Sequence, residues 1–306
     1  MGNTRYYLIY ILFVMAMITG CTPPADKFME SGLEKSSKGD YKGAIMDYTE
    51  AIRLDTFMTE AYNNRAAAKL KLNDFRGAIR DYNKVADLDP ENATAYFNRG
   101  IAWDKSGDKS RAIRDYSKAI KLAPGFAEAY YNRGNTLAYI KSYEDAIEDY
   151  TKAISLKPDD ADAIYNRGLA RCNVDDFKTA ITDFNHAIRL NPKLTGAFIN
   201  RAAAKYRLGD DTGALADYNK AFELDSKNTA ILMNRGAVRS KMKDYQGAIR
   251  DFTMAIDLKP TDGSLFHNRA HAKRESGDLK GACDDWNQAV RLGYKAAKEN
   301  IARYCK

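Results

Sequence analysis

The chain has 306 residues, of which 45% are hydrophobic and 29% are charged, which is typical of a folded protein. The formal net charge is +7, but 48 basic and 41 acidic residues are interleaved, without a long run of Lys or Arg. A nucleic-acid partner is therefore not expected. Twenty Tyr and twelve Phe against two Trp make the aromatic set rich in tyrosine.

The N-terminus has the pattern of an export signal. Arg5 precedes an apolar stretch at residues 6–18, and small residues follow it up to Cys21. One positive charge, an apolar segment and small residues before a cleavage site are typical of a secretory signal peptide. The segment is shorter than the about 20 residues that a membrane-spanning helix needs. We expect a signal peptide at residues 1–20, with an uncleaved N-terminal anchor as the alternative.

The end of this segment, the run ITGC that closes on Cys21, resembles the lipobox of bacterial lipoproteins. The resemblance implies that Cys21 is lipidated and becomes the first residue of the mature chain. Residues 21–26 would then be the lipidated Cys and a short tether. The resemblance also implies a protein attached to a membrane of the bacterial cell envelope through its N-terminal lipid. Thr22, in place of the Asp associated with inner-membrane retention, favours the outer membrane.

Beyond this segment the sequence repeats itself every 34 residues. A run of the form Ala-Ile-x-Asp-Tyr, or a close variant, recurs at that interval without insertion or deletion. It begins at Ala44, Ala78, Ala112, Ala146, Ala180, Ala214, Ala248 and Ala282. This self-similarity defines eight repeats, at residues 25–58, 59–92, 93–126, 127–160, 161–194, 195–228, 229–262 and 263–296.

Several positions of the repeat carry the same kind of residue in all eight copies. The eighth is Gly or Ala, the twentieth is Ala, the twenty-fourth is aromatic and the thirtieth is Leu. In the first repeat, Ala44, Tyr48, Ala51 and Leu54 are three or four residues apart and so share one helical face. Gly-Asp or an equivalent pair marks a turn near position 15, and Pro ends most repeats. Each repeat is therefore expected to be a close-packed helical hairpin.

These columns resemble the tetratricopeptide repeat family over residues 25–296. The resemblance implies an all-α fold, a right-handed α-solenoid of eight helical hairpins. Because one repeat cannot bury its own apolar face, neighbouring repeats must stack. We expect a C-terminal capping helix within residues 295–306, with Ala297, Ile301 and Tyr304 covering the last face. The repeats leave no room for a catalytic domain, so an enzyme is not expected.

Arg occupies position 7 of repeats 2–8, and Asp occupies position 23 of all eight repeats. The first repeat has Asp47 but Ser31 in place of the Arg. An Arg that paired with the Asp of the preceding repeat would have no partner in repeat 1. We therefore expect a structural ladder of ion pairs between repeats. The expected pairs are Arg65–Asp47, Arg99–Asp81, Arg133–Asp115, Arg167–Asp149, and so on to Arg269–Asp251.

Asn occupies position 6 of repeats 2–8, a position that lines the concave groove in the family. A side-chain amide offers donors and an acceptor to the backbone of an extended peptide. The column resembles the asparagine ladders of peptide-binding repeat proteins, and position 5 adds an apolar and aromatic stripe. The expected groove residues are Asn64, Asn98, Asn132, Asn166, Asn200, Asn234 and Asn268, with Phe97, Tyr131, Tyr165, Ile199 and Met233. The alternative is that the Asn side chains bridge neighbouring repeats.

Two further groups of residues leave alternatives open. His267 and His271 are spaced to hold a metal ion, but such pairs occur by chance on surface helices, and we expect no metal and no cofactor. Cys172 lies in a first helix and is expected to be a small core or groove residue. Cys283 and Cys305 either form a disulfide in an oxidising compartment or remain two free thiols.

The sequence thus predicts a non-enzymatic protein–protein interaction scaffold, lipid-anchored in the bacterial envelope. It would bind an extended peptide or a partner protein in its concave groove. The alternative is a structural spacer or assembly factor that acts through its convex face or its termini. A third interpretation, an enzyme or metal protein, rests on His267 and His271 alone.

Overall fold

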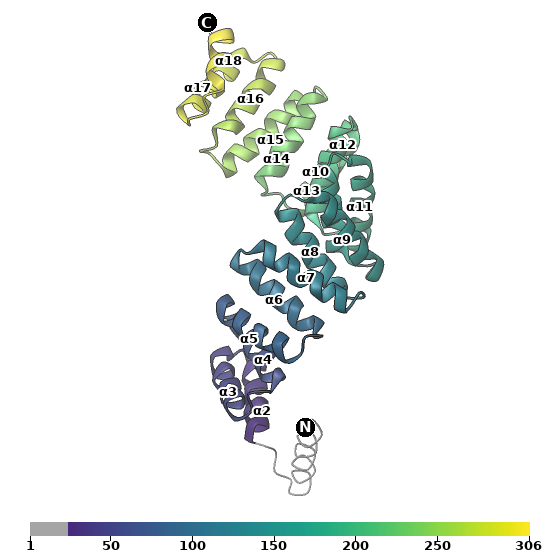
Figure 1. The fold of residues 1–306 in the computed structure, drawn as a ribbon. Coiled ribbons are helices and arrows are strands. Elements are labelled where there is room, and N and C mark those ends of the chain that lie inside the picture. Colours follow the sequence, from purple (N-terminus) through teal and green to yellow (C-terminus); the bar gives the residue numbers. More distant parts are fainter. Residues whose placement is uncertain (1–23) are drawn as a thin grey trace. The chain divides into compact units, whose positions relative to one another are not determined.

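The computed structural model describes residues 24–306, and the predicted signal peptide and the lipid-attachment residue Cys21 lie outside this range. The described chain consists of helices, α2 to α18, without a β-strand (Figure 1). This confirms the predicted all-α fold of helical hairpins with a C-terminal helix. None of the described helices has the length and apolar character needed to cross a membrane.

The chain forms two compact units, which divide between Leu156 and Lys157. The described part of the N-terminal unit holds four hairpins, one from each of the first four repeats. Their helices are α2 (Pro24–Ser37) and α3 (Tyr41–Leu54), α4 (Thr59–Lys71) and α5 (Phe75–Leu88), α6 (Ala93–Ser106) and α7 (Lys109–Leu122), and α8 (Ala127–Tyr139) and α9 (Tyr143–Leu156).

The C-terminal unit holds the other four hairpins and a last helix. The hairpins are α10 (Ala161–Asn173) and α11 (Phe177–Leu190), α12 (Thr195–Arg207) and α13 (Asp211–Leu224), α14 (Thr229–Lys241) and α15 (Tyr245–Leu258), and α16 (Gly263–Glu275) and α17 (Leu279–Arg291). The last helix is α18 (Ala297–Tyr304).

The first helix of the structure overlaps the end of the predicted tether. The tether was expected at residues 21–26 and the first repeat from residue 25; α2 starts at Pro24, and Ala25 is buried. Proline is well suited to the first turn of a helix, because its φ is already helical and no amide hydrogen is needed there. Residues 24–26 therefore belong to the folded body.

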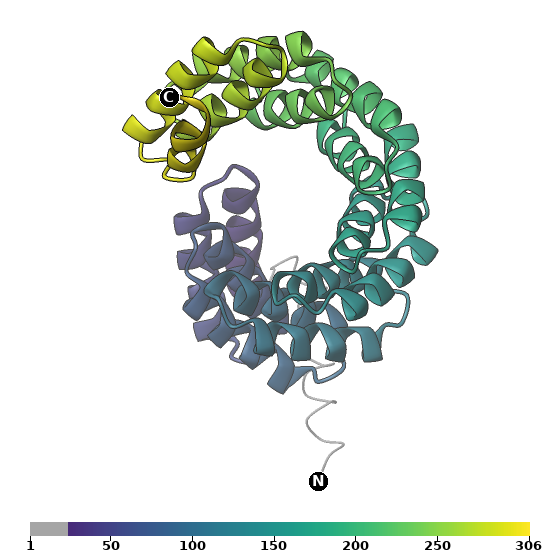
Figure 2. The ribbon, with the colours of Figure 1, turned by 90° about the horizontal axis from the view of Figure 1, so that it is seen from above.

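Within each unit the hairpins stack with their first helices on one side. Direct contacts join α2 to α4, α4 to α6 and α6 to α8, and likewise α10 to α12 and α14 to α16. The second helices lie on the other side of each stack (Figure 2). We call the row of first helices the inner surface of a unit and the row of second helices its outer surface.

The turn inside each hairpin is built by two adjacent positions. The residue at position 15 has a left-handed backbone conformation, with a φ of 80° at Gly39 and of 66° at Lys141. Position 16 is an Asp in seven repeats, and its carboxylate caps the second helix; Asp40 Oδ1 accepts from the amide of Gly43 at 2.9 Å. A side-chain cap of this kind satisfies an amide that the helix itself leaves unbonded.

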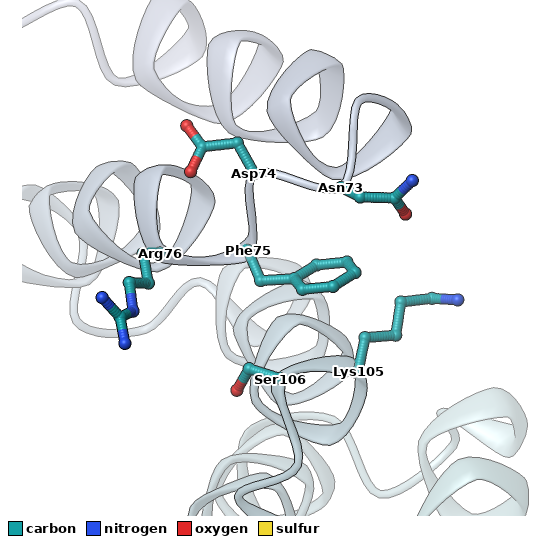
Figure 3. Close-up of a pocket in the computed structure, with 6 residues that line it drawn as sticks. All are labelled: Asn73, Asp74, Phe75, Arg76, Lys105 and Ser106. Atoms are coloured by element: carbon teal, nitrogen blue, oxygen red, sulfur yellow. The ribbon is translucent and has the colours of Figure 1, made fainter.

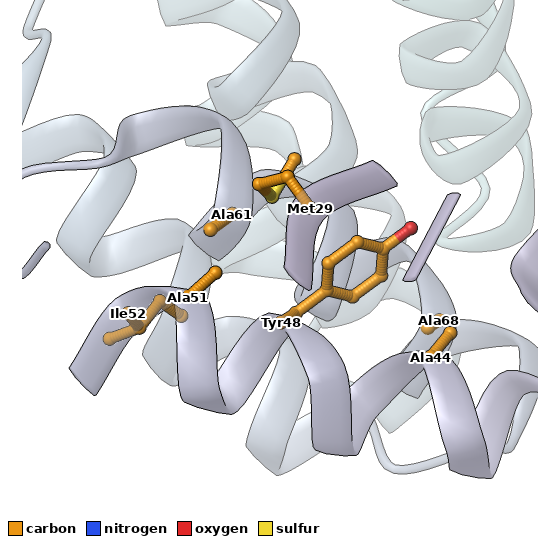
Figure 4. Packing of buried hydrophobic residues seen from close by; sticks show 7 residues of the cluster. All are labelled: Met29, Ala44, Tyr48, Ala51, Ile52, Ala61 and Ala68. Carbon is orange, nitrogen blue, oxygen red and sulfur yellow. The ribbon is translucent and has the colours of Figure 1, made fainter. Parts of the chain in front are cut away.

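The aromatic at position 24 fills the space between the two helices of a repeat. Tyr48 is 1% exposed and packs with Met29, Ala44 and Ala51 (Figure 4). A Cβ on Gly32 would lie 2.5 Å from a ring carbon of Tyr48, so the ring would have to shift to admit it. The invariably small position 8 is therefore explained by the neighbouring ring.

The C-terminal helix α18 covers the last hairpin as predicted. Ala297 is buried, and the Tyr304 ring stacks on the buried Trp286 with ring centroids 5.8 Å apart. The structure joins Cys283 on α17 to Cys305, just after α18, by a disulfide with a Cα–Cα distance of 5.6 Å. Of the two alternatives for these cysteines, the structure contains the bonded one.

Candidate interaction surface

The Arg and Asp columns pair within each repeat, so the predicted pairing between repeats is wrong. Arg65 donates through Nε and Nη2 to both carboxylate oxygens of Asp81, at 2.9 and 2.8 Å, and does not pair with Asp47. The pairs are Arg65–Asp81, Arg99–Asp115, Arg133–Asp149, Arg167–Asp183, Arg201–Asp217, Arg235–Asp251 and Arg269–Asp285. The two helices of one hairpin hold the partners face to face, which permits this bidentate geometry.

The guanidinium nevertheless bridges repeats through its remaining nitrogen. Nη1 of Arg65 donates to Thr49 Oγ1 of the preceding repeat at 3.0 Å. The same bond joins Arg99 to Asn83, Arg133 to Ser117, Arg201 to Asn185, Arg235 to Asn219 and Arg269 to Thr253. The acceptor is position 25, which is Thr, Ser or Asn in all eight repeats. This column of hydrogen-bond acceptors is the feature of the sequence from which the bond between repeats could have been predicted.

A second cation holds the same Asp in most repeats. Position 11 supplies it, as where Lys69 Nζ lies 2.7 Å from Asp81 and Arg171 lies 2.7 Å from Asp183. The sequence showed the basic character of this column but not its partner. In the first repeat, Lys35 is this position-11 cation and Ser31 takes the place of the Arg; each bonds Asp47 at 2.6 Å.

These hydrogen bonds stabilise the ionised forms of the Asp and Arg side chains. Burial raises the pKa of Asp47, but hydrogen bonds from Lys35 and Ser31 outweigh it, and the pKa falls below its ordinary value. The hydrogen bond to Asp115 likewise raises the pKa of Arg99. Both groups are therefore ionised at neutral pH. Because these Arg and Asp groups bond one another and the neighbouring repeat, we regard the ladder as structural.

The seven Asn side chains all lie on first helices, on the inner surface, and are half-buried. Asn132 donates to the backbone oxygen of Glu128 in its own helix at 2.8 Å. Asn200 donates to Gly196 O at 2.8 Å and also to the hydroxyl of Tyr165 in the preceding repeat, at 2.9 Å. Bridging between repeats, the alternative for this column, therefore applies to Asn200.

Other members of the column are not engaged in this way. Within residues 24–306, the side-chain amides of four Asn bond to no other group of the chain; they are Asn64, Asn98, Asn234 and Asn268. These four amides are therefore open to a partner on the inner surface, two in each unit.

The aromatic side chains of position 5 lean on the core and are half-buried. Phe97 contacts Tyr116 and Phe126, with ring centroids 5.9 and 4.7 Å apart. Tyr131 and Tyr165 contact the position-24 rings of their own repeats at 6.1 and 5.9 Å. These side chains thus contribute an edge to the inner surface, and the rest of each ring is packed inside the repeat.

Apolar and amide groups dominate the middle of the inner surface. In the C-terminal unit, positions 5, 6 and 9 carry no Asp, Glu, Lys or Arg. Position 9 there is Leu169, Ala203, Ala237 and His271, of which Ala237 is exposed and the others half-buried. In the N-terminal unit the same three positions carry one charged residue, Glu30. Each inner surface therefore offers amides beside apolar groups.

His267 and His271 point their Nε2 atoms at each other across 3.1 Å. Burial lowers the pKa of His267 to about 4 and lowers that of His271, so both rings are neutral at neutral pH. Nδ1 of His267 is buried without a partner. A metal ion on Nε2 would place a proton on this Nδ1, which has no acceptor. The pair therefore fits a hydrogen bond from His267 to His271 better than a metal site.

Two remaining features do not form a site. A cavity of about 440 Å³ opens beside the turn between α4 and α5 and the end of α6 (Figure 3). Its two cations, Arg76 and Lys105, extend to opposite sides and do not converge on one ligand. Cys172 is a half-buried free thiol, and burial raises its pKa to about 11, which keeps it protonated and unreactive.

Hairpins that contact their immediate neighbours, with a row of first helices on one side, define an α-helical repeat scaffold. The chain belongs to the tetratricopeptide repeat family, whose models match residues 63–125, 127–160 and 161–194. No curated protein matches the chain.

Several solved structures are similar. The MamA protein is 30% identical, with a TM-score of 0.52, over 55% of this chain and 92% of MamA. YrrB, described as a repeat protein of this family with an unusual peptide-binding site, is 22% identical over 60% of this chain and 95% of its own, with a TM-score of 0.56. The C-terminal part of a repeat protein from Cytophaga hutchinsonii is 19% identical over 78% of this chain and 98% of its own, with a TM-score of 0.67.

Proposed function

We propose that the protein is a non-enzymatic scaffold that binds an extended segment of a partner protein along its inner surface. The observation that carries this proposal is the set of open side-chain amides of Asn64, Asn98, Asn234 and Asn268. In each unit the two members come from successive repeats, so they recur at a regular interval along the surface. The amide and carbonyl groups of an extended peptide also recur at a regular interval, so they can bond successive Asn side chains of the inner surface.

The neighbouring side chains indicate the chemistry of the bound segment. A charged side chain placed over positions 5, 6 and 9 of the C-terminal unit would lose water without gaining a counter-charge. An apolar or aromatic side chain would instead be buried against groups such as Leu169 and Ala237. The segment that fits best is therefore uncharged and apolar in its centre.

Membership of the family supports the general part of the proposal, that the protein is an interaction scaffold. Tetratricopeptide repeat proteins are in general interaction modules, and MamA is 30% identical to this chain over the aligned part. YrrB shows that the fold can carry a peptide-binding site, although its likeness to this chain concerns the fold. The described residues hold no group of three or more His, Cys, Asp or Glu arranged for a metal ion.

The test compares two Asn substitutions with a matched control. Photo-crosslinking in intact cells identifies the partner, and a peptide from it is then titrated against the purified protein. The variant Asn234→Ala/Asn268→Ala loses two amide bonds of about 1 kcal/mol each, which predicts roughly thirtyfold weaker binding. Asn287→Ala is the control, because Asn287 is exposed on the outer helix α17.

Unchanged affinity in the double variant would contradict binding at this surface. If the partner is then crosslinked at an outer helix or a terminus, the spacer or assembly factor becomes the correct function. Loss of binding in the control as well would point to a change in the fold, which circular dichroism detects.

We further infer that the protein is exported and held in the bacterial envelope by a lipid at Cys21, with the outer membrane favoured. The disulfide between Cys283 and Cys305 supports export, because such bonds persist in oxidising compartments. The lipobox-like run before Cys21 supports the lipid. Labelling of cells with a radioactive fatty acid tests this inference. Label is expected in the wild-type protein and not in Cys21→Ser, and an unlabelled wild type contradicts it.

A further inference from the structure

The outer surface of the N-terminal unit carries a helix that is basic along its whole length. On α7, Arg111, Arg114 and Lys121 are exposed and Lys118 is half-buried. Arg111 pairs with the capping residue Asp108 at 3.4 Å, whereas Arg114, Lys118 and Lys121 have no acidic partner in the described chain. The acidic residue within this helix, Asp115, is 8% exposed and bonded to Arg99, so it does not offset their charge at the surface. The preceding outer helix, α5, adds further cations, which are Arg76, Arg80 and Lys84.

The next outer helix in the same unit has the opposite charge. Glu144, Asp145 and Glu148 are exposed on the N-terminal half of α9. Its inward acid, Asp149, is bonded to Arg133. Lys152 is exposed one turn after Glu148, so the acidic surface is confined to the beginning of the helix. A basic and an acidic surface therefore lie on successive second helices, α7 and α9, on either side of α8.

An exposed apolar spot connects the two charged helices. Tyr139, the last residue of α8, and Ile140, the first residue of the turn before α9, are 73% and 49% exposed. The ammonium group of Lys109, the first residue of α7, lies 4.5 Å from the centroid of the Tyr139 ring. This contact places the aromatic ring at the beginning of α7 and close to the beginning of α9. The ring therefore lies at the end of the hairpins where both α7 and α9 begin.

We propose that this surface binds the same surface of a second copy of the chain, around a two-fold axis. In this arrangement α7 of each copy faces α9 of the other, and the Tyr139 side chains meet near the axis. A two-fold interface requires a patch that is complementary to itself, and adjacent surfaces of opposite charge fulfil this requirement. The proposal concerns the outer surface and does not depend on peptide binding at the inner surface.

The balance of forces predicts a salt-sensitive dimer. Exposed ion pairs are individually weak and are screened within about 10 Å at 0.1 M salt. The two Tyr139 rings and Ile140 supply the apolar centre that charges alone do not provide. A bilayer or a protein with a uniformly acidic surface suits this region less well, because the acids of α9 would repel it next to the attractive α7.

Paired charge reversals test the proposal by sedimentation velocity. All proteins carry Cys21→Ser, so that acyl chains do not cause association. The background protein is expected to dimerise at about 0.05 M salt and to dissociate at about 0.5 M. The variants Arg114→Glu and Glu144→Lys/Glu148→Lys should each be monomeric, because like charges then face each other. An equimolar mixture of the two should form a heterodimer, since each reversed surface meets its new complement.

The mixing experiment distinguishes this interface from association through another part of the outer surface. Arg250→Glu is the matched control on α15, where Arg250 holds the same repeat position as Arg114, and it should leave the dimer intact. The three reversed side chains, Arg114, Glu144 and Glu148, are exposed and bond to no group of the described chain, so the fold should be retained. A monomer at every salt concentration, or a mixture that stays monomeric, overturns the proposal. Binding of the monomer to phosphatidylglycerol vesicles through α7 would assign the basic surface to lipid instead.

Discussion

Asp115 and Asp217 occupy the same position in repeats 3 and 6 but have different numbers of cationic partners. Arg99 is the cation that bonds Asp115 in the described chain, because position 11 of repeat 3 is Trp103. Asp217 is bonded by Arg201 and also by Lys205, at 2.8 Å. Both carboxylates are buried, with 8% and 5% of their surface exposed. The two repeats therefore differ in how well they tolerate loss of the Arg.

We predict that Arg99→Met destabilises the protein more than Arg201→Met does. The first substitution leaves a buried carboxylate without a counter-charge, which costs about 3 kcal/mol, whereas the second leaves Lys205 in place. Urea denaturation followed by circular dichroism measures the two losses. Adding Asp115→Leu to Arg99→Met should recover part of the stability, because the uncompensated charge is removed. Equal losses in the two single variants would show that the second cation has no effect.

The sequence predicted the Arg and Asp columns but not which members pair. Arg65 is 18 residues from Asp47 and 16 residues from Asp81, and both separations suit adjacent helices of a stack. The missing Arg of repeat 1 was interpreted as the loss of an Asp partner. In the structure Asp47 is held by Lys35 and Ser31, so the absence of the Arg does not leave it unpaired. Repetition alone does not show which Asp an Arg bonds.

At the scale of the helices, the repeated columns predicted most of the fold. Gly or Ala at position 8, the aromatic at position 24 and the Asp cap are local requirements of a hairpin, and they are visible in one sequence. The left-handed turns at Asn73, Lys141, Asp175 and Lys243 are less visible, because these residues do not require a positive φ. Packing of the two helices imposes that conformation. The same holds for the half-buried rings of position 5, whose tilt depends on their neighbours.

The capping helix α18 gives a prediction about the disulfide. The bond closes a loop between residues 22 positions apart, which in the chain-entropy account stabilises the folded end by about 3 kcal/mol. Reduction should therefore loosen α18 and uncover Trp286, which is fully buried beneath Tyr304. In a Trp103→Phe background, the remaining tryptophan fluorescence should shift to the red on reduction, at a denaturant concentration well below global unfolding.

The double variant Cys283→Ser/Cys305→Ser controls for this experiment. It should show the shifted spectrum without reductant and should not respond to reductant. An unchanged spectrum of the reduced parent protein would mean that the packing of Ala297, Ile301 and Tyr304 is sufficient to hold the cap.

At the scale of the whole molecule, stability is distributed over many similar contacts. The principal helix contacts of the described chain lie within one hairpin or between neighbouring hairpins of a unit. No core residue of the described chain gathers distant repeats around itself, in contrast to a globular domain with one centre. Such an array opens in segments, and the free energy of opening is a property of a repeat and its neighbours.

Native-state hydrogen exchange of the Arg99→Met variant tests this distribution. Amide protection should fall in α6 and α7 and less strongly in α5 and α8, which contact them directly. Protection in α14 to α17 should match the wild type, because no direct contact connects those helices to repeat 3. Arg201→Met should move the loss to α12 and α13 and make it smaller, since Lys205 still holds Asp217. A uniform loss over all helices in both variants would instead show that the array opens as a single cooperative unit, in which case local contacts do not determine local stability.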